Sequence, residues 1–452
     1  MKKKVRKRRR GKEIEITIRV RVDDEMSLAE LERLIDEAGD QAKREALTDV
    51  LHDEVPEKPQ ECRACGRQGV LYGRGSGPLR FKAVFGPIAT RQPRYRCSDC
   101  GAEYYPVEEN LELIRPGPVS PGVYRLAVLE GISRSYEQAS LHLAEVSRER
   151  ILLSAKDIHA LVQQAGAEHL RRREEEVAVL WAEPQQASVL ARRRPGDLFC
   201  VQADGGWVPG REVPKEHIEG KVVKMWWDSC RKKRGQRGVI TEKSYVATFE
   251  GADAVGREAL AVSLTMGVDE QTKVLFLADG DKALRETVWQ VYFPWATYRL
   301  DWRHLRNYVW RAVRQMWTDP EQQRTAGRQW VQWLWDGERD QMRAAVDRVS
   351  GLGGEAEKAR RNLLQYLDDN WAGIGCYHLW WLQDEIISSS IIEKAVDEVI
   401  VRRQKKQGMV WSRTGANVVA ALRALWCSGR KCWDQFWRGQ PILVQSNACL
   451  HA

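Results

Sequence analysis

Hydrophobic residues at the start of this chain recur first with a period of two and then with helical spacing. Residues 13–22 (EIEITIRVRV) alternate strictly, a pattern typical of a strand. Ser27 precedes a helical pattern through Leu28–Ala38, and Glu30 stands three residues after Ser27, as in a capping box. Residues 56–60 indicate a linker. We therefore expect a strand and a helix before the first linker.

Residues 119–177 show three short helical patterns. The third opens with Ser154 and Asp157, spaced to cap a helix that continues as IHALVQQAGAEHL. In a basic protein such helices favour a helix-turn-helix-like unit that binds DNA. Any small helical bundle shows the same pattern, so a purely structural bundle is the alternative.

The pattern changes from residue 197 to short apolar runs. Predicted strands are LFCVQAD, GKVVKMWWD, SYVATFE, KVLFLAD and ATYRL, and predicted helices are Gly256–Met266 and Ala283–Phe293. Residues 304–381 are almost wholly helical in pattern, and helices follow at Glu393–Arg403 and Gly415–Trp426. Three strands, a helix, a strand, a helix and a strand is the element order of a ribonuclease-H-like domain. A helical insertion would then separate this domain from its last helices.

Composition and charge indicate a globular protein with a polyanionic partner. The 452 residues are 30% charged and 43% hydrophobic. No apolar run approaches the ~20 residues that span a bilayer, and the first ten residues lack a signal peptide's apolar stretch. We therefore expect a soluble cytoplasmic protein without membrane contact. The net charge is +9, and basic clusters occur in the first ten residues and at Arg192–Arg194, Arg231–Arg234 and Arg402–Lys406. Together they favour nucleic acid, although each alone is explained by a solvated surface.

Four of the ten cysteines have the spacing of a zinc site. Cys62 and Cys65 form one Cys-x-x-Cys pair followed by glycine, and Cys97 and Cys100 form a second. Strand-like pieces lie between the pairs, so the segment predicts a zinc ribbon holding structural Zn²⁺ through four thiolates. Free thiols are the alternative. The 19 tryptophans, most of them after residue 285, are explained by a Trp-rich core or by base stacking.

Two predicted strands end in Asp-Gly, at Asp204-Gly205 and at Asp279-Gly280. Phosphodiester chemistry uses two divalent cations about 4 Å apart. Carboxylates are the hard oxygen ligands that Mg²⁺ or Mn²⁺ prefers. We expected each glycine to turn the chain sharply beside the aspartate. A single Asp-Gly is more simply explained by a turn.

From about residue 60 to 437 the chain resembles bacterial insertion-sequence transposases of the Kra type, relatives of the Mutator-like DDE superfamily. The matching stretches are CRACG, CSDCG, ADGGWVP, YVATFEGADAVGRE, FLADGDKALRETVWQVYFPWATYRLDWRHL, IISSSIIEKAVDEVIVRRQKKQGMVWSRTGANVVAALRAL and WDQFW. The resemblance implies an RNase H-like core with a helical insertion. It also implies that Asp204, Asp279 and Glu393 are the catalytic carboxylates that hold the metal ions.

The chain departs from the family before Glu393. The family's Ile-Gly-Ser-Gly turn reads Ile387-Ser388-Ser389-Ser390 here, which we expected to stiffen or redirect the approach to the glutamate. The first ~50 residues match nothing in this family.

Further residues have candidate roles. The family has a similar Asp-x-x-His, so Asp301 and His304 are possible auxiliary residues near the scissile phosphate, or capping and packing residues instead. Positions where we expected DNA contact are Arg402, Arg403, Lys405, Lys406, Trp411 and Arg413, with a core position as the alternative for Trp411.

These observations predict a multidomain α/β protein. Its expected parts are a basic tail with a strand and helix (1–58), a zinc ribbon (59–118), an HTH-like DNA-binding region (119–180), the first part of an RNase H-like core (196–304), a helical insertion (305–385), the last core helices (386–437) and a tail (438–452).

The predicted activity is that of a DDE transposase that binds the ends of its element as double-stranded DNA, cuts a strand and joins it to target DNA, acting as a homodimer or larger assembly. The alternatives are a domesticated DNA-binding protein that has lost cutting, and an RNase H-like nuclease without strand transfer.

Overall fold

The computed structural model describes residues 4–8, 11–53, 61–62, 64–67, 70–71, 78–92, 94–105, 111–114, 117–182, 194–212, 216–234, 237–406 and 408–440. The linker predicted at 56–60, two arginines of the 192–194 cluster and most of the tail predicted at 438–452 lie outside these residues. The described residues form two compact units, Met1–Gln164 and Ala165–Ala452, so the multidomain α/β class is confirmed. The division falls inside one helix, earlier than the boundary expected at residue 180.

The first unit begins with a strand hairpin and a long helix. Strands β1 (Lys4–Arg8) and β2 (Gly11–Glu15) pair antiparallel, so β2 covers only the start of the strand predicted over 13–22. Helix α1 (Leu28–Asp53) is much longer than expected but begins where the capping box placed it. The Ser27 amide donates to Glu30 Oε2 at 2.9 Å, and the Glu30 amide donates to Ser27 Oγ at 3.4 Å. Both amides at the start of the helix are therefore satisfied.

Two small sheets follow α1. Strands β3 (Val70–Leu71), β6 (Tyr95–Arg96) and β7 (Glu103–Tyr104) form one antiparallel sheet, and β4 (Leu79–Ala83) with β5 (Gly86–Thr90) forms a hairpin. The inward side chains of this hairpin form an apolar cluster with Leu51 of α1. The hairpin alternates buried and exposed residues because only one of its faces is covered.

Three helices complete the first unit, as the sequence predicted: α3 (Pro121–Ser133), α4 (Tyr136–Val146) and α5 (Ala155–Ala182). Ser120 and Ser135 cap α3 and α4 by accepting from the amides of Val123 and Gln138. Ser154 and Asp157 form a reciprocal capping box at the start of α5. The second half of α5 belongs to the second unit.

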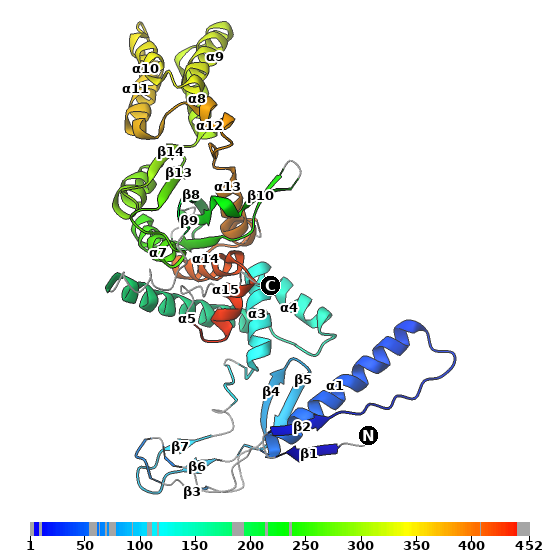
Figure 1. Cartoon of the computed structure of the whole chain (residues 1–452). Coiled ribbons are helices and arrows are strands. Elements are labelled where there is room, and N and C mark those ends of the chain that lie inside the picture. Colours follow the sequence, from blue (N-terminus) through cyan, green and yellow to red (C-terminus); the bar gives the residue numbers. More distant parts are fainter. Residues whose placement is uncertain are drawn as a thin grey trace. The chain divides into compact units, whose positions relative to one another are not determined.

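The second unit is built on a mixed five-stranded sheet in the order β12-β9-β8-β13-β14 (Figure 1). Its strands are β8 (Leu198–Pro209), β9 (His217–Trp227), β12 (Ser244–Thr248), β13 (Lys273–Ala278) and β14 (Thr297–Leu300). The first three pair antiparallel, whereas β13 runs parallel to both β8 and β14. A short turn η1 (Asp228–Cys230) leads into a side hairpin of β10 (Arg231–Arg234) and β11 (Arg237–Ile240).

Each face of this sheet has its own apolar layer because neighbouring residues of a strand point to opposite sides. Phe199, Val201 and Ala203 share one layer with α7 (Ala252–Thr265) and the π-helix η2 (Leu284–Tyr292). Cys200, Trp226, Leu275 and Leu277 form the other layer with Ile386 and Ile391. The second layer lies against helix α13 (Ser390–Val396), which continues as the π-helix η4 (Asp397–Lys405).

The insertion after β14 is helical, as predicted, and lies beyond β13 and β14 in the second unit (Figure 1). It contains α8 (Trp302–Met316), α9 (Pro320–Asp336), α10 (Arg339–Arg348), α11 (Gly354–Asp369), η3 (Trp371–Gly373) and α12 (Tyr377–Leu382). Its core contains buried Trp330, with Trp302, Trp317 and Trp335 packed against it. A Trp-rich core therefore accounts for these residues. Helices α14 (Arg413–Ser428) and α15 (Arg430–Trp437) end the unit.

Within the described residues, none of the helices is apolar over enough of its length to traverse a bilayer.

Candidate functional site

Strands β8 and β13 bring the two predicted aspartates to one place. The parallel pairing sets Leu277 opposite Gln202. Asp279 and Asp204 each follow two residues later, so they continue the same register. Side chains two residues apart point to the same face of a sheet, here the face that carries Leu275, Leu277 and α13. Since neighbouring strands lie about 4.8 Å apart, the two carboxylates meet at this edge.

Asp204 does not stand at the end of its strand, which corrects one prediction. Strand β8 continues to Pro209, paired with β9 along its whole length. Gly205 has no positive φ and does not turn the chain. What ends at this point is β13, and there the prediction was right: Gly280 has a φ of +93°. Asp204 therefore lies beside the end of β13. Its carboxylate is not covered by that strand.

A pair of glycines allows the helix of Glu393 to approach the sheet. Gly206 and Gly220 pair directly across β8 and β9. A Cβ atom on Gly206 would lie 2.9 Å from Val396 Cγ1, and one on Gly220 would lie 2.9 Å from Ile400 Cδ1. A larger residue at Gly206 would crowd Val396 of α13, and one at Gly220 would crowd the Phe249 ring as well as Ile400. The sequence motif Asp-Gly-Gly thus serves helix packing as well as the carboxylate.

The charges around Asp204 show which groups are gathered here. Burial raises the pKa of Asp204 to about 6, and the negative charge of Asp279 is the next largest cause. Glu393 raises it further, while His304 lowers it. The hydrogen bond with Asp301 raises the pKa of His304, and the charges of Asp279 and Asp204 add to this effect. These shifts link Asp204 to Asp279, Glu393 and His304, and they link His304 to Asp301.

Asp301 connects the insertion to the turn before Glu393. Its side chain is fully buried, and one carboxylate oxygen caps α8 by accepting from the His304 amide. The other oxygen accepts from the Ser389 amide. Three further hydrogen bonds hold the same segment, Glu385–Ser389. Gln202 Nε2 donates to the Ser388 carbonyl at 3.3 Å, and Arg299 donates to the Ile386 carbonyl at 2.9 Å. The Trp302 amide donates to the Ile387 carbonyl at 2.9 Å.

The serine turn adopts ordinary backbone conformations. Ser388, Ser389 and Ser390 all avoid positive φ, and Ser389 has a φ of −78°. No position of this turn requires glycine, because the backbone is held by Asp301 and Gln202 rather than by a special conformation. Replacement of the family's glycines by serine therefore leaves the approach to Glu393 unstrained.

We expect Asp301→Ala to lower the free energy of unfolding by about 2–4 kcal/mol, because two backbone N–H groups lose their acceptor and one of them is buried. Urea denaturation measures this loss. Asp319→Ala is the matched control, since Asp319 caps α9 in the same way but at an exposed site. The control should cost about 1 kcal/mol. Equal losses in the two variants would show that the Ser389 contact contributes nothing.

Glu393 is held by two neighbours. Its Oε2 lies 3.2 Å from Arg303 Nη1, and its Oε1 accepts from Ser389 Oγ at 3.3 Å. Arg303 was missed by the sequence reasoning, although it stands between Asp301 and His304. The ligand atoms of Asp204, Asp279 and Glu393 do not all lie within 4.8 Å of one another; of the residues described, only four cysteines meet that condition.

The six residues for which DNA contact was predicted divide into two groups. Arg403 and Trp411 are buried, with the Arg403 guanidinium 5.1 Å from the Trp411 ring centre, so these two predictions are wrong for the folded chain. The Trp411 indole donates to the Gln404 carbonyl at 2.9 Å, which makes it a core residue. The exposed residues are Arg402, Lys405, Lys406 and Arg413. Asp397 pairs with two of them, Arg402 and Lys406.

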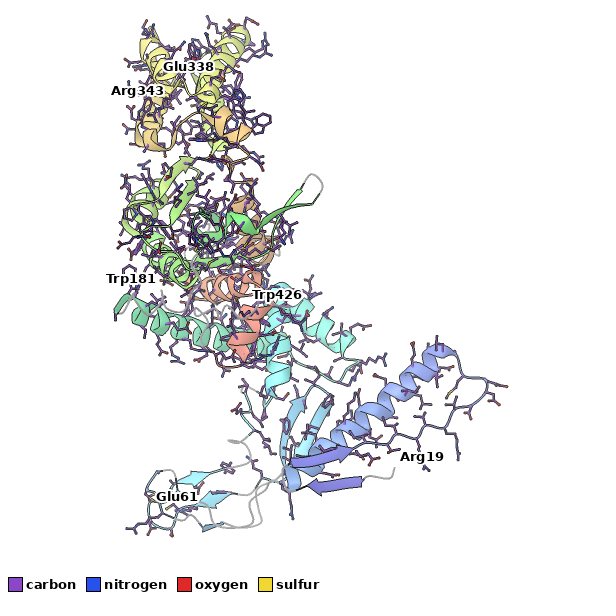
Figure 2. The ribbon with its side chains drawn as sticks, viewed as in Figure 1. Arg19, Glu61, Trp181, Glu338, Arg343 and Trp426 are labelled. Carbon is purple, nitrogen blue, oxygen red and sulfur yellow. The ribbon has the colours of Figure 1, made fainter. Side chains whose placement is uncertain are left out.

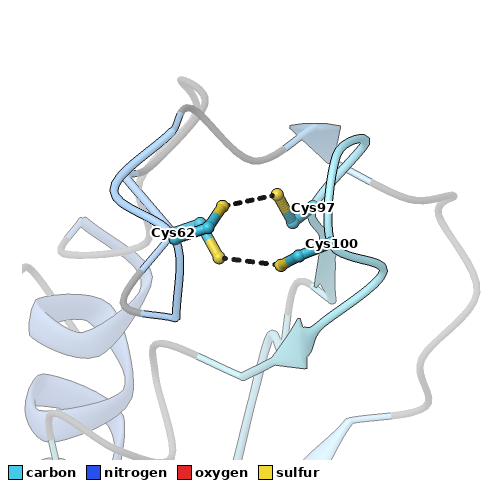
Figure 3. Close-up of side chains that lie close together, drawn as sticks. Cys62, Cys97 and Cys100 are labelled. Carbon is cyan, nitrogen blue, oxygen red and sulfur yellow. Dashed lines mark hydrogen bonds between the residues drawn. The ribbon is translucent and has the colours of Figure 1, made fainter.

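The four spaced cysteines form a compact cluster, the candidate structural metal site (Figure 3). Cys62 Sγ lies 3.6 Å from Cys100 Sγ, and Cys65 Sγ lies 3.4 Å from Cys97 Sγ. A tetrahedral zinc ion with Zn–S bonds of about 2.3 Å separates its sulfurs by about 3.8 Å. The cluster therefore has the size and the donor atoms for Zn²⁺.

The two halves of the cluster are equivalent knuckles. Gly66 and Gly101, which each follow a cysteine pair directly, have φ of +75° and +70°. Their amides donate to the carbonyls of Cys62 and Cys97 at 2.7 and 3.0 Å. The amides of Cys100 and Asp99 lower the pKa of the Cys97 thiol to about 7. The contact with the Cys97 thiol in turn raises the pKa of the Cys65 and Cys100 thiols, so the thiolate is favoured at Cys97 and not at those two positions.

Three similar proteins come from Caldanaerobacter subterraneus subsp. tengcongensis, and each is named a UPF0236 protein. Each is 22% identical to this chain over 91% of its length, and the matches cover 81%, 80% and 76% of the relatives. One family model matches residues 21–440, which takes in the cysteine cluster, the sheet edge with its carboxylates and part of the first 50 residues. Because that match spans nearly the whole chain, the protein belongs to the uncharacterised protein family UPF0236.

Proposed function

We propose that this protein is a DDE-type transposase related to the Kra-type insertion-sequence enzymes, with Asp204, Asp279 and Glu393 as its catalytic carboxylates. One observation carries the proposal. The equal register of β8 and β13 places two aspartates on the sheet face that also receives the helix of Glu393. Three acidic residues from distant parts of the chain thus lie at one sheet edge, and their mutual effect on pKa supports this grouping.

The order of the strands supports an RNase H-like core. Three antiparallel strands come first in the chain, and two parallel strands follow on the other side of β8. The predicted element order of an RNase H-like domain implies the same arrangement of strands. The helical insertion falls between the second aspartate and the glutamate, as the resemblance implied.

The donor atoms suit Mg²⁺ or Mn²⁺, since both ions prefer carboxylate oxygen. Bound there by Asp204, Asp279 and Glu393, two such ions would activate the attacking oxygen and stabilise the leaving oxygen of a phosphodiester. Arg303 neutralises Glu393 and would have to release it for ligation. Asp301 positions the turn before Glu393 and also positions His304. The raised pKa of His304 favours the positively charged imidazolium, which would face the phosphate.

The relatives supply a further argument. The name of one joins eleven designations from a single strain, and the name of another joins four. One protein name that joins many designations of a single strain is what copies of a mobile element would produce. For this chain we propose that the cysteine cluster is a zinc ribbon. Together with helices α3–α5, it would read the element's terminal repeats in a dimer or larger assembly.

The test uses the purified full chain and supercoiled plasmid with Mg²⁺ or Mn²⁺, and also linear DNA taken from either side of the gene. We expect nicking, and joining of the cut flanking DNA to the plasmid. Asp279→Asn and Glu393→Gln should each remove both activities. Nicking that survives in both variants would refute the assigned carboxylates.

A protein that binds DNA without cutting it is the second candidate, favoured by the spacing of the carboxylates and by the Arg303–Glu393 pair. It predicts DNA binding without nicking by the wild type. An RNase H-like nuclease would nick the plasmid and never join the ends.

A further inference from the structure

Helix α8 exposes a row of arginines beside the carboxylates. Its apolar side chains, Leu305, Val309, Ala312, Val313 and Met316, all face the insertion's core. Its sequence, WRHLRNYVWRAVRQM, contains no acidic residue. At 100° per residue the arginines fall on the side away from that core. This arginine row consists of Arg303, Arg306, Arg311 and Arg314, all of them exposed.

The row is not neutralised by the protein. Among the described residues only Arg303 has a carboxylate within 4.0 Å, that of Glu393. Arg311 and Arg314 instead lie over the rings of Tyr308 and Trp310, at 4.6 and 5.9 Å.

Several other arginines of the insertion have acidic partners, whereas the exposed Arg328 and Arg348 have none among the described residues. Arg324 lies 2.5 Å from Glu321, and Arg343 lies 2.6 Å from Asp368. Like charges three or four residues apart destabilise a helix. Repulsion within the row therefore destabilises α8, and binding of an anionic partner would remove that repulsion.

The row begins at the candidate site and leads away from it. Arg303 forms an ion pair with Glu393. The charges of Asp279 and Asp204 raise the pKa of the next residue, His304. The eleven helical steps from Arg303 to Arg314 span about 16 Å, or about five base-pair steps of duplex DNA at ~3.4 Å per phosphate on one strand. A DNA strand placed at the carboxylates would therefore find cations along its next few phosphates.

We propose that the arginine row of α8 binds the phosphate backbone of the duplex DNA whose strand is cut at Asp204, Asp279 and Glu393. The role of this DNA as substrate rests on the proposed function, whereas the binding surface rests on α8 itself. The residues after Glu393 are a weaker surface, because Asp397 already neutralises Arg402 and Lys406 and because Arg403 is buried. The contact is sequence-independent, since arginines on phosphates position DNA without reading bases.

The test removes three charges from the row and leaves Arg303 with Glu393. The variant is Arg306→Gln/Arg311→Gln/Arg314→Gln in the full chain. Its control, Arg324→Gln/Arg343→Gln/Arg361→Gln, removes the same charge from exposed arginines that have acidic partners; Figure 2 labels Arg343 in the insertion. Fluorescence anisotropy with a labelled duplex of about 30 bp, a length of several helical turns, gives the affinity over a series of salt concentrations.

We expect the row variant to reduce the slope of log affinity against log salt by about 2–3, because each lost phosphate contact is worth about 0.9. The control should change it by less than about 1. Thermal melting of both variants shows whether they fold; if the row variant melts early, Arg314→Gln alone should lower the slope by about 1.

Equal slopes in the row variant, the control and the wild type overturn the proposal, as do equal losses in both variants or a wild type that does not bind the duplex. The two proposals fail separately. A wild type whose binding depends on the row but which never nicks DNA contradicts only the proposed function. A wild type that nicks DNA and whose binding ignores the row contradicts only this inference.

Discussion

Asp204→Asn is expected to reduce metal-dependent nicking by about 10³-fold or more, the largest effect we expect from one substitution. An amide cannot supply the negative ligand that a carboxylate gives a divalent ion, and such an ion contributes several kcal/mol of charge stabilisation in the transition state. Each ~1.4 kcal/mol is a factor of ten in rate. The measurement is the initial rate of plasmid nicking in Mn²⁺ at pH 8.

The same substitution should stabilise the protein without metal, which separates loss of chemistry from loss of fold. The folded pKa of Asp204 is about 6, against an ordinary value of 3.8. The folded state therefore holds this proton more tightly than the unfolded state. Stability falls as the pH rises from about 4 to 6, by up to about 3 kcal/mol once the group is ionised in both states.

Asp204→Asn removes that cost, so its melting temperature in EDTA should exceed that of the wild type at pH 8 and approach it at pH 4. Asp340→Asn, an exposed carboxylate on α10, is the control and should leave both nicking and melting nearly unchanged. A variant that nicks at the wild-type rate would remove Asp204 from the site. An Asp204→Asn protein that melts at a lower temperature than the wild type at pH 8 would show that the folded state stabilises the Asp204 charge.

Removal of zinc is the second large effect. We expect one Zn²⁺ per chain by elemental analysis, and Cys97→Ser should reduce this to less than about 0.1. The ribbon strands contain only two residues each, too few to form a stable sheet alone. Structural zinc sites contribute about 10–16 kcal/mol of apparent binding free energy, so the sheet of β3, β6 and β7 should unfold and become sensitive to protease. The hairpin of β4 and β5 should stay folded, because it packs on Leu51 of α1.

Cys376→Ser provides the comparison, because Cys376 is a partly exposed free cysteine outside the cluster. It should retain full zinc and wild-type resistance to protease. If Cys97→Ser protein keeps its metal and its resistance, the cluster is a set of ordinary thiols. The rest of the chain should remain folded in either variant, since its apolar cores lie elsewhere.

Local features of this structure were predictable wherever a short pattern has one physical solution. The capping boxes at Ser27 and Ser154 start helices at the predicted residues because each side chain satisfies an amide within three residues. The two Cys-x-x-Cys-Gly knuckles close on each other because their glycines adopt the left-handed conformation. Alternation and helical spacing likewise predicted the order of strands and helices from β8 to β14.

Predictions failed where a residue's role depends on a partner distant in sequence. Gly205 was expected to turn the chain, but β9 pairs with β8 beyond it and keeps it extended. Arg403 and Trp411 are residue types that often contact DNA, yet here both are buried and contact each other. The turn before Glu393 is held by Asp301, 88 residues earlier, a contact that no local pattern predicts.

The sequence by itself therefore determined most of the elements and the four-cysteine cluster, since these depend on neighbours within a few positions. Only the tertiary structure decided which residues surround the carboxylates. The register of β8 against β13, the glycine pair that admits α13 and the contact of Arg303 with Glu393 join segments 75 to 190 residues apart. Such contacts arise from packing between whole elements, and no local pattern encodes them.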